Sequence, residues 1–197
     1  MTPPNTHPYL RESASQTAGP YVHIGCMPND VGLPMYGGAN LGARMLGDDF
    51  EGPRVTVRGR VIDGTGMVLR DAMVEAWQAD AEGRFPPDAV PGFHGFARSG
   101  CDADGVWSFE TTRPGAVPFA DGRPQHPHVT LMVFARGINL GLHTRMYWPG
   151  ADLDGDPMLA RIEQRERRET LVAREEDGGL RFDIRLQGPG ETVFLDV

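Results

Sequence analysis

Apolar and polar residues alternate with a period of two along several short segments of the chain. In residues 54–62, valines alternate with threonine and arginine, which predicts a half-buried strand that ends at the turn formers of residues 63–66. A helical period is expected only at residues 159–173. The further strands predicted by this pattern, or by β-favouring residues, lie at residues 72–78, 106–111, 126–134, 140–148, 180–186 and 192–197.

Glycine and proline are frequent between these segments. The 197 residues include 26 glycines and 17 prolines, which favour turns and interrupt helices. Short strands joined by long loops, with one short helix near residues 159–173, predict a mostly β protein, and a β-sandwich is the architecture that fits best. The length suits a single domain with its own core, which we assign to residues 53–197.

Residues 1–52 follow neither period and contain several prolines. An irregular segment of this length is uncommon inside a compact domain, and it usually has a functional role or wraps a neighbouring chain. Within it, Gly19 and Pro20 place a flexible residue before a rigid one, which brings backbone close to a ligand or to another chain. We therefore expect an extended N-terminal arm with such a role, and an ordinary surface loop is the alternative.

The charge of the chain argues against a nucleic-acid partner. All 19 basic residues are arginine, and 27 acidic residues give a formal net charge of -8, whereas phosphate binding usually leaves a basic excess. The arginine-rich run at residues 161–168 is interrupted by glutamates and is typical of a solvated helix face. The two cysteines are too few for a disulfide framework, and no apolar run is long enough to span a membrane. We expect a soluble, cytoplasmic protein.

His126 and His128 are the residues with the clearest chemical potential. In an extended strand, residues two apart point to the same face, so the two imidazoles could share one metal ion. Two imidazoles are only half of a four-ligand site, and a His-x-His sequence also occurs by chance. Other chemistry has less support, because the chain has no Gly-x-Ser-x-Gly sequence, no phosphate loop before a helix and no cysteine in a nucleophile's setting.

The sequence Arg123-Pro124-x-His126-x-His128 resembles the histidine motif of the intradiol ring-cleaving dioxygenases. These are β-sandwich enzymes in which two tyrosinates and two histidines hold ferric iron. The resemblance covers the chain from about Ser15 to its end, and it is carried further by the segments 15–25, 75–80, 134–139, 167–171 and 181–184.

The two tyrosine ligands of this family are absent at the matching positions. Phe85 follows the Gly-Arg pair where the first tyrosine is expected, and Val117 takes the place of the second; Tyr21, Tyr36 and Tyr147 lie elsewhere in the pattern. Without anionic oxygens, His126 and His128 are underligated for ferric iron. The resemblance therefore implies a chain without metal, an alpha chain, paired with a homologous beta chain that carries the Fe(III).

The resemblance also implies which residues face the substrate. The N-terminal arm would contact the partner chain. Arg136 would lie near the carboxylate of the substrate, protocatechuate, because a guanidinium forms charge-assisted hydrogen bonds with a carboxylate. The enzyme would cleave protocatechuate with O2 to 3-carboxymuconate. The alternatives are a surface role for Arg136, a self-sufficient iron enzyme, or a β-sandwich scaffold or binding module without catalysis. The positions assigned to the substrate pocket are Thr17, Gly19, Pro20, Tyr21 and Arg136.

Overall fold

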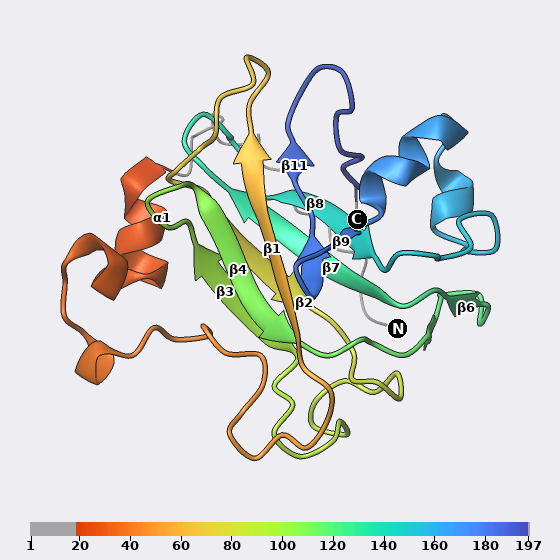
Figure 1. Cartoon of the computed structure of the whole chain (residues 1–197), viewed down its shortest axis with the longest axis horizontal. Coiled ribbons are helices and arrows are strands. Elements are labelled where there is room, and N and C mark those ends of the chain that lie inside the picture. Colours follow the sequence, from red (N-terminus) through yellow and green to blue (C-terminus); the bar gives the residue numbers. More distant parts are fainter. Residues whose placement is uncertain (1–18, 197) are drawn as a thin grey trace, which may run out of the picture.

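Two β-sheets packed face to face form the body of the protein in the computed structural model, which describes residues 19–196 (Figure 1). The mostly β prediction is confirmed. In the first sheet, β1 pairs antiparallel with β4 and parallel with β10 and β11, and β9 pairs with β10. Its strands are β1 (Val55–Ile62), β4 (Val106–Thr111), β9 (Arg174–Glu176), β10 (Gly179–Arg181) and β11 (Ile184–Arg185).

The second sheet is antiparallel throughout and has the strand order β3-β2-β7-β8. The strand that begins at His128 is therefore internal, and Pro127, which cannot donate to a ladder, stands just before its first residue. A separate ribbon pairs β5 (Val117–Pro118) with β6 (Pro124–Gln125). The strands of the second sheet are β2 (Met73–Trp77), β3 (Phe96–Gly100), β7 (His128–Phe134) and β8 (Leu142–Tyr147).

The core lies between the two sheets and follows the alternation along their strands. In β7, Val129, Leu131 and Val133 are fully buried, and the residues between them are half-buried on the other face. Trp107 and Phe109 of β4 contribute the largest inward side chains from the first sheet. Burial of these apolar surfaces is the main stabilising term of the fold.

Gly59 allows β1 to meet the chain that links β10 to β11. A Cβ atom at this position would overlap the backbone carbonyl of Phe182. The amide of Phe182 donates to the carbonyl of Arg58 at 2.8 Å, so the two backbones are in direct contact here. Only glycine fits at such a close approach.

The N-terminal part that the structure describes is not extended throughout. Residues Gly19–Cys26 form a helix, α1, and the short 3-10 helices η1 (Pro28–Val31) and η2 (Tyr36–Gly38) follow it. The expectation of an extended arm is therefore wrong at α1, where the turn formers Gly19 and Pro20 begin a helix. Further along, Met45, Leu46 and Phe50 belong to the core, and the boundary at residue 52 stays a prediction.

The C-terminal third differs from the sequence prediction in three places. The helix expected at 159–173 is two 3-10 helices, η3 (Leu159–Arg161) and η4 (Arg165–Leu171), because Ile162 adopts extended backbone angles. The strand expected at 180–186 is divided between β10 and β11. Residues 192–196 form no strand and are held by separate hydrogen bonds such as Leu195 N to His143 O, 2.8 Å.

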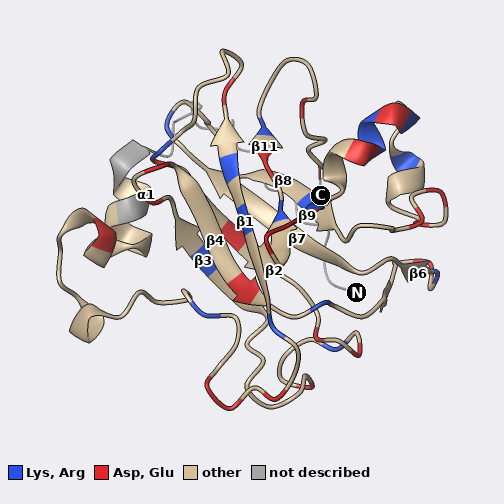
Figure 2. Ribbon diagram, viewed as in Figure 1, with Lys and Arg blue, Asp and Glu red and all other residues tan. Residues whose placement is uncertain are grey.

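Positively and negatively charged side chains are interspersed along η4 (Figure 2). Most of the arginines and glutamates of residues 161–169 are exposed, as expected for a solvated helix face. Arg167 is half-buried, and the side chain of Arg168 is buried and donates to Asp154 at 3.0 Å. Among residues 19–196, no helix is long and apolar enough to cross a membrane.

Candidate functional site

The predicted site residues fall into two groups at opposite ends of β7. The first group, which we call the histidine site, comprises Phe85, Val117, His126 and His128. The second lies around Arg136, which follows the last residue of β7 by two positions. The outer face of the four-stranded sheet lies between the two groups.

In the histidine site, backbone contacts fix both histidines at the start of β7. The amide of His126 donates to the carboxylate of Asp156 at 2.8 Å. The carbonyl of His126 accepts a hydrogen bond from Nδ1 of His128 at 2.7 Å. With Nδ1 donating, Nε2 is the only nitrogen of His128 left to act as an acceptor or a ligand.

The loops that carry Phe85 and Val117 are packed backbone against backbone. A Cβ atom on Gly83, which has a φ of +80°, would overlap the carbonyl of Ala116, and the amide of Gly115 donates to the carbonyl of Asp80 at 2.7 Å. Phe85 then stacks on Trp77, with ring centroids 5.9 Å apart and planes inclined by 8°.

The ladder registers bring the four positions of the histidine site to one end of the sheet. Trp77, on which Phe85 stacks, is paired with Thr130 of β7, two residues after His128. Val117 is paired with Gln125, the residue before His126. The structure therefore places the two histidines and the two positions of the missing tyrosines at the same end of the sheet.

Asp80 organises the turn that leads to Phe85. Its carboxylate is fully buried and accepts hydrogen bonds of 2.9 Å from the amides of Glu82, Arg84 and Val90. Burial acts to raise the pKa of Asp80, but these backbone donors outweigh it and hold the pKa below its usual value. A charged Asp80 thus stabilises this loop.

The sequence prediction missed Arg145, which lies beside the histidines. It is paired with Thr130 across the β7–β8 ladder, and its Nη1 donates to Gln125 Oε1 at 2.7 Å and to the hydroxyl of Tyr147 at 3.4 Å. The signal was present in the sequence, because the alternation along residues 140–148 puts Arg145 and Tyr147 on one face.

Tyr147 also lies closer to the histidines than the sequence motif predicts. It is paired with His128 across the ladder, and the two rings are 5.6 Å apart. Burial, with a smaller effect from Arg145, lowers the pKa of His128 to about 4, and burial raises the pKa of Tyr147 to about 12. At neutral pH, His128 is therefore neutral and the phenol of Tyr147 is protonated.

These residues do not fit the ferric iron of the intradiol dioxygenases. Phe85 and Val117 offer no oxygen, Tyr147 keeps its proton, and the guanidinium of Arg145 already brings a positive charge next to His128. Ferric iron requires anionic oxygen ligands to balance its charge. Within residues 19–196, no three His, Cys, Asp or Glu side chains are grouped so that they could hold a metal ion.

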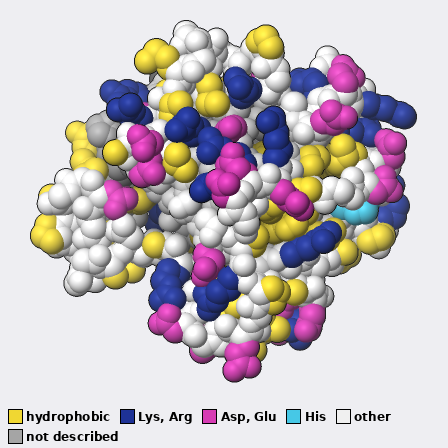
Figure 3. Space-filling model, in the orientation of Figure 1, with side chains coloured by type: hydrophobic (Ala, Val, Ile, Leu, Met, Phe, Trp, Pro, Cys, Tyr) yellow, Lys and Arg dark blue, Asp and Glu magenta, His cyan; other side chains and the backbone are white. Residues whose placement is uncertain are grey.

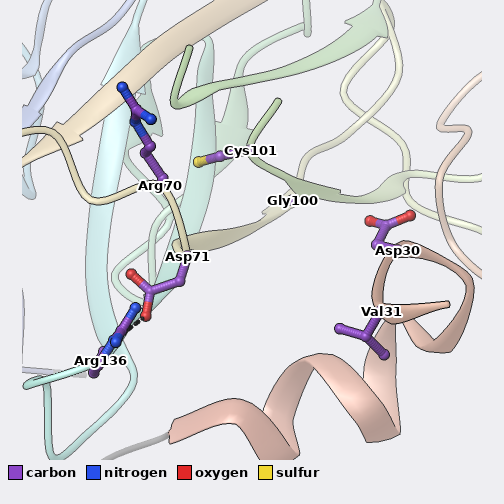
Figure 4. Close-up of a pocket in the computed structure, with 7 residues that line it drawn as sticks. All are labelled: Asp30, Val31, Arg70, Asp71, Gly100, Cys101 and Arg136. Carbon is purple, nitrogen blue, oxygen red and sulfur yellow. Dashed lines mark hydrogen bonds and ion pairs between the residues drawn. The ribbon is translucent and has the colours of Figure 1, made fainter. Parts of the chain in front are cut away.

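At the other end of the sheet, Arg136 borders a pocket of about 360 Å³ (Figure 4). Its Nε donates to Asp71 Oδ2 at 2.8 Å, and its side chain remains 77% exposed. Asp30 and Val31 of η1 lie on the opposite side of the pocket. The other lining residues are Arg70, Asp71, Gly100 and Cys101.

The 3-10 helix η1 and Arg136 border the same pocket because of the register of the second sheet. Gly100 of β3, Met73 of β2 and Phe134 of β7 are aligned across the ladder, and η1 packs on Gly100. A Cβ atom on Gly100 would lie 2.8 Å from the terminal methyl group of Met27, so the two segments are in close contact here. The segment after α1 and the arginine after β7 thus border the same pocket.

The assignment of the remaining pocket residues stays a prediction. Thr17 lies outside the described residues, and Gly19 and Pro20 form the first turn of α1. Tyr21 follows in α1 with 80% of its surface exposed. Cys101, which lines the pocket, is half-buried, and burial raises its pKa to about 11, so it remains a thiol and is no nucleophile.

Large exposed hydrophobic side chains are concentrated in residues 21–41. Hydrophobic atoms are visible along the edge of the molecule that carries α1, η1 and η2 (Figure 3). Large hydrophobic side chains that are exposed within one segment are candidates for an interaction surface. We call this set the apolar patch, and its members are Tyr21, Ile24, Val31, Leu33, Met35, Tyr36 and Leu41.

Comparison with known proteins agrees with this architecture. Residues 38–188 match the family described as Dioxygenase. The chain is 44% identical over 196 residues to the protocatechuate 3,4-dioxygenase alpha chain of Pseudomonas putida, covering 95% of this chain and 97% of that protein. It is 33% identical over 226 residues to the protocatechuate 3,4-dioxygenase beta chain of Burkholderia cepacia, covering 96% of this chain and 92% of that protein.

The fold is also similar to that of a solved structure, catechol 1,2-dioxygenase from Acinetobacter sp. ADP1. The TM-score is 0.56 at 21% sequence identity, and the match covers 73% of this chain and 55% of that chain. The sequence resemblance drawn from the histidine motif is confirmed at the level of the family. This chain belongs to the intradiol dioxygenase family.

Proposed function

We propose that this chain is the metal-free alpha subunit of a protocatechuate 3,4-dioxygenase. It would act in the cytoplasm with a homologous beta chain that carries Fe(III), and together they would cleave protocatechuate with O2 to 3-carboxymuconate. The near full-length similarity to an alpha chain, at 44% identity, supports this assignment. The reaction inserts both oxygen atoms and opens the ring between its two hydroxyl-bearing carbons, and the ferric iron of the beta chain supplies that chemistry.

The observation that carries the proposal is the separation of Arg136 from the histidine site. β7 contains seven residues, which at about 3.3 Å per residue span roughly 20 Å. Arg136 therefore cannot bind a substrate that lies at the chain's own histidines. Because Arg136 is exposed and lies far from the histidines, it can bind a substrate that is held in the active site of another chain.

The contribution of this chain is then to bind and orient the substrate. A guanidinium donates charge-assisted hydrogen bonds to a carboxylate, and its planar fork fixes the orientation of a benzoate. Arg136 would bind the carboxylate of protocatechuate, and Thr17, Gly19, Pro20 and Tyr21 would form a wall of the same pocket. With the carboxylate held, the two hydroxyl groups on the far side of the ring are directed towards the partner chain.

The apolar patch supports a permanent partner. Seven large hydrophobic side chains at residues 21–41 would be shielded from water in an interface, and interfaces between obligate partners are large and apolar. The patch lies next to the pocket that Arg136 borders, since Val31 belongs to both. One interface could therefore cover the patch and close the pocket.

Co-expression with a homologous beta chain that contains both ligand tyrosines tests the proposal. We expect the two chains to co-purify in equal amounts, with one iron per pair, and with ring-cleaving activity that this chain lacks alone. Stoichiometric iron and activity in this chain alone would instead identify a self-sufficient enzyme. A chain that remained monomeric and left the activity of the beta chain unchanged would be a scaffold or binding module.

A further inference from the structure

Asp71 and Arg136 continue the register of two neighbouring strands beyond the end of their ladder. Met73 of β2 is paired with Phe134 of β7. Because the strands are antiparallel, a step of two residues outward on each places Asp71 opposite Arg136 on the same face. Ala72, which follows Asp71, and Ala135, which precedes Arg136, are almost completely buried, so the backbone next to both residues is held in place.

The contact between these two side chains leaves the outer edge of the guanidinium available. Asp71 Oδ2 accepts from Nε of Arg136 at 2.8 Å, and the two side chains point towards one another at the side of the pocket (Figure 4). Among residues 19–196, neither terminal nitrogen of Arg136 donates a hydrogen bond. These two nitrogens form the fork that binds a carboxylate with two parallel hydrogen bonds.

The exposure of this ion pair indicates that it is not needed for folding. The side chains of Arg136 and Asp71 are 77% and 32% exposed, and ion pairs exposed to this degree contribute little to stability. An unpaired arginine at the same place would sample many rotamers, and ordering it on binding reduces affinity. A carboxylate that already holds Nε removes part of this entropic loss.

We propose that Asp71 is a positioning residue that holds the Arg136 guanidinium with its fork directed at the substrate carboxylate. This inference rests on the proposed function. It assigns to Asp71 an effect on substrate choice that its distance from the histidine site would not suggest. Asp71 acts through Arg136 and has no direct contact with the substrate.

The test uses the assembled enzyme, with this chain and its iron-bearing partner co-expressed. Asp71→Ala is expected to raise KM for protocatechuate roughly tenfold with kcat nearly unchanged, because an oriented charged hydrogen bond is lost in part. Catechol has no carboxylate, so its KM should not change. Asp71→Asn keeps an acceptor for Nε and should recover most of the loss.

The control is Asp48→Ala, which removes the partner of Arg44 in an exposed ion pair outside the pocket. It should leave KM for both substrates unchanged.

Arg136→Ala and the double variant separate this inference from the proposed function. If Asp71 acts through Arg136, Asp71→Ala adds no further loss in the Arg136→Ala background. A selective loss in Arg136→Ala with none in Asp71→Ala would overturn the positioning role and leave the proposed function standing. Equal losses on both substrates, a full further loss in the double variant, or tighter protocatechuate binding in Asp71→Ala would also overturn it. If Arg136→Ala itself had no effect, the proposed function of Arg136 would fail, and the role of Asp71 with it.

Discussion

His128 and Arg136 lie at the two ends of one strand, with His128 as the first residue of β7 and Arg136 two positions beyond its last. The histidine site and the exposed arginine therefore lie at opposite ends of the same sheet. In a single-chain enzyme, a substrate-binding arginine would have to lie near the metal. Here the fold keeps them apart.

The first prediction concerns iron. The chain purified alone should contain no ferric iron and show no visible tyrosinate charge-transfer band, because Phe85 and Val117 supply no oxygen. Introducing both tyrosines, in F85Y/V117Y, leaves the guanidinium of Arg145 next to Tyr147. We expect full iron content only when Arg145→Gln is added, as measured by metal analysis and absorption spectra. One iron per unmodified chain would contradict this.

The second prediction concerns pH. The pKa of His128 is about 4 in the folded chain, because of burial and then Arg145, against 6.5 for an ordinary histidine. Between these values the unfolded chain binds a proton that the folded chain does not. The free energy of unfolding should therefore fall by about 3 kcal/mol in total as the pH drops from 6.5 to 4.

Urea denaturation at several pH values measures this effect. His128→Gln should remove that part of the pH dependence, whatever it does to stability at neutral pH. His94→Gln, which replaces an exposed histidine elsewhere in the chain, is the matched comparison variant. An identical pH slope in wild type and His128→Gln would show that His128 has no depressed pKa.

The third prediction concerns Gly59 and the contact between β1 and Phe182. Gly59→Ala should destabilise the fold by about 3 kcal/mol or more, because the added methyl group overlaps a backbone carbonyl that cannot move alone. Gly25→Ala in α1 is a suitable control, since nothing lies within 4 Å of a Cβ at that position. Equal stability of the two variants would argue against this strand packing.

The fourth prediction concerns the apolar patch. Ile24→Ser and Leu41→Ser should weaken assembly with the beta chain without lowering the thermal stability of this chain, because both side chains are exposed before assembly. Met67→Ser provides a control, since Met67 is also exposed but lies outside the patch. Sedimentation of the mixed chains measures the effect. Unchanged assembly in both patch variants would exclude this surface from the interface.

Much of the β architecture could be predicted from alternation, and the failures have local causes. β1, β2, β4, β7 and β8 lie where valine-rich or aromatic runs predicted them. β3 was missed because only Ala97 of its five residues is fully buried, and it lies in a stretch rich in glycine and proline. The helix α1 was not predicted because a flexible Gly19 before a rigid Pro20 indicates close approach of the backbone to a ligand or another chain, although proline is also favoured in a first helical turn.

The candidate site was predictable as a set of residue types but not as an arrangement. The histidine motif identified His126 and His128 and the two missing tyrosines. The proximity of Arg145 and Tyr147 depends on the register of β7 with β8, and the contact between Asp71 and Arg136 depends on that of β2 with β7. The pattern along one strand indicates which of its residues face the core, but it does not indicate which strand lies beside it.

The central claim is that a chain without metal determines the substrate specificity of the iron site in its partner chain. The variant Arg136→Ala tests this claim most directly. In the assembled enzyme with unchanged iron content, kcat/KM for protocatechuate should fall roughly ten- to a hundredfold, because a charged partner of the carboxylate is lost. The low activity on catechol should stay nearly the same. Equal losses on both substrates, or no loss on either, would contradict the claim.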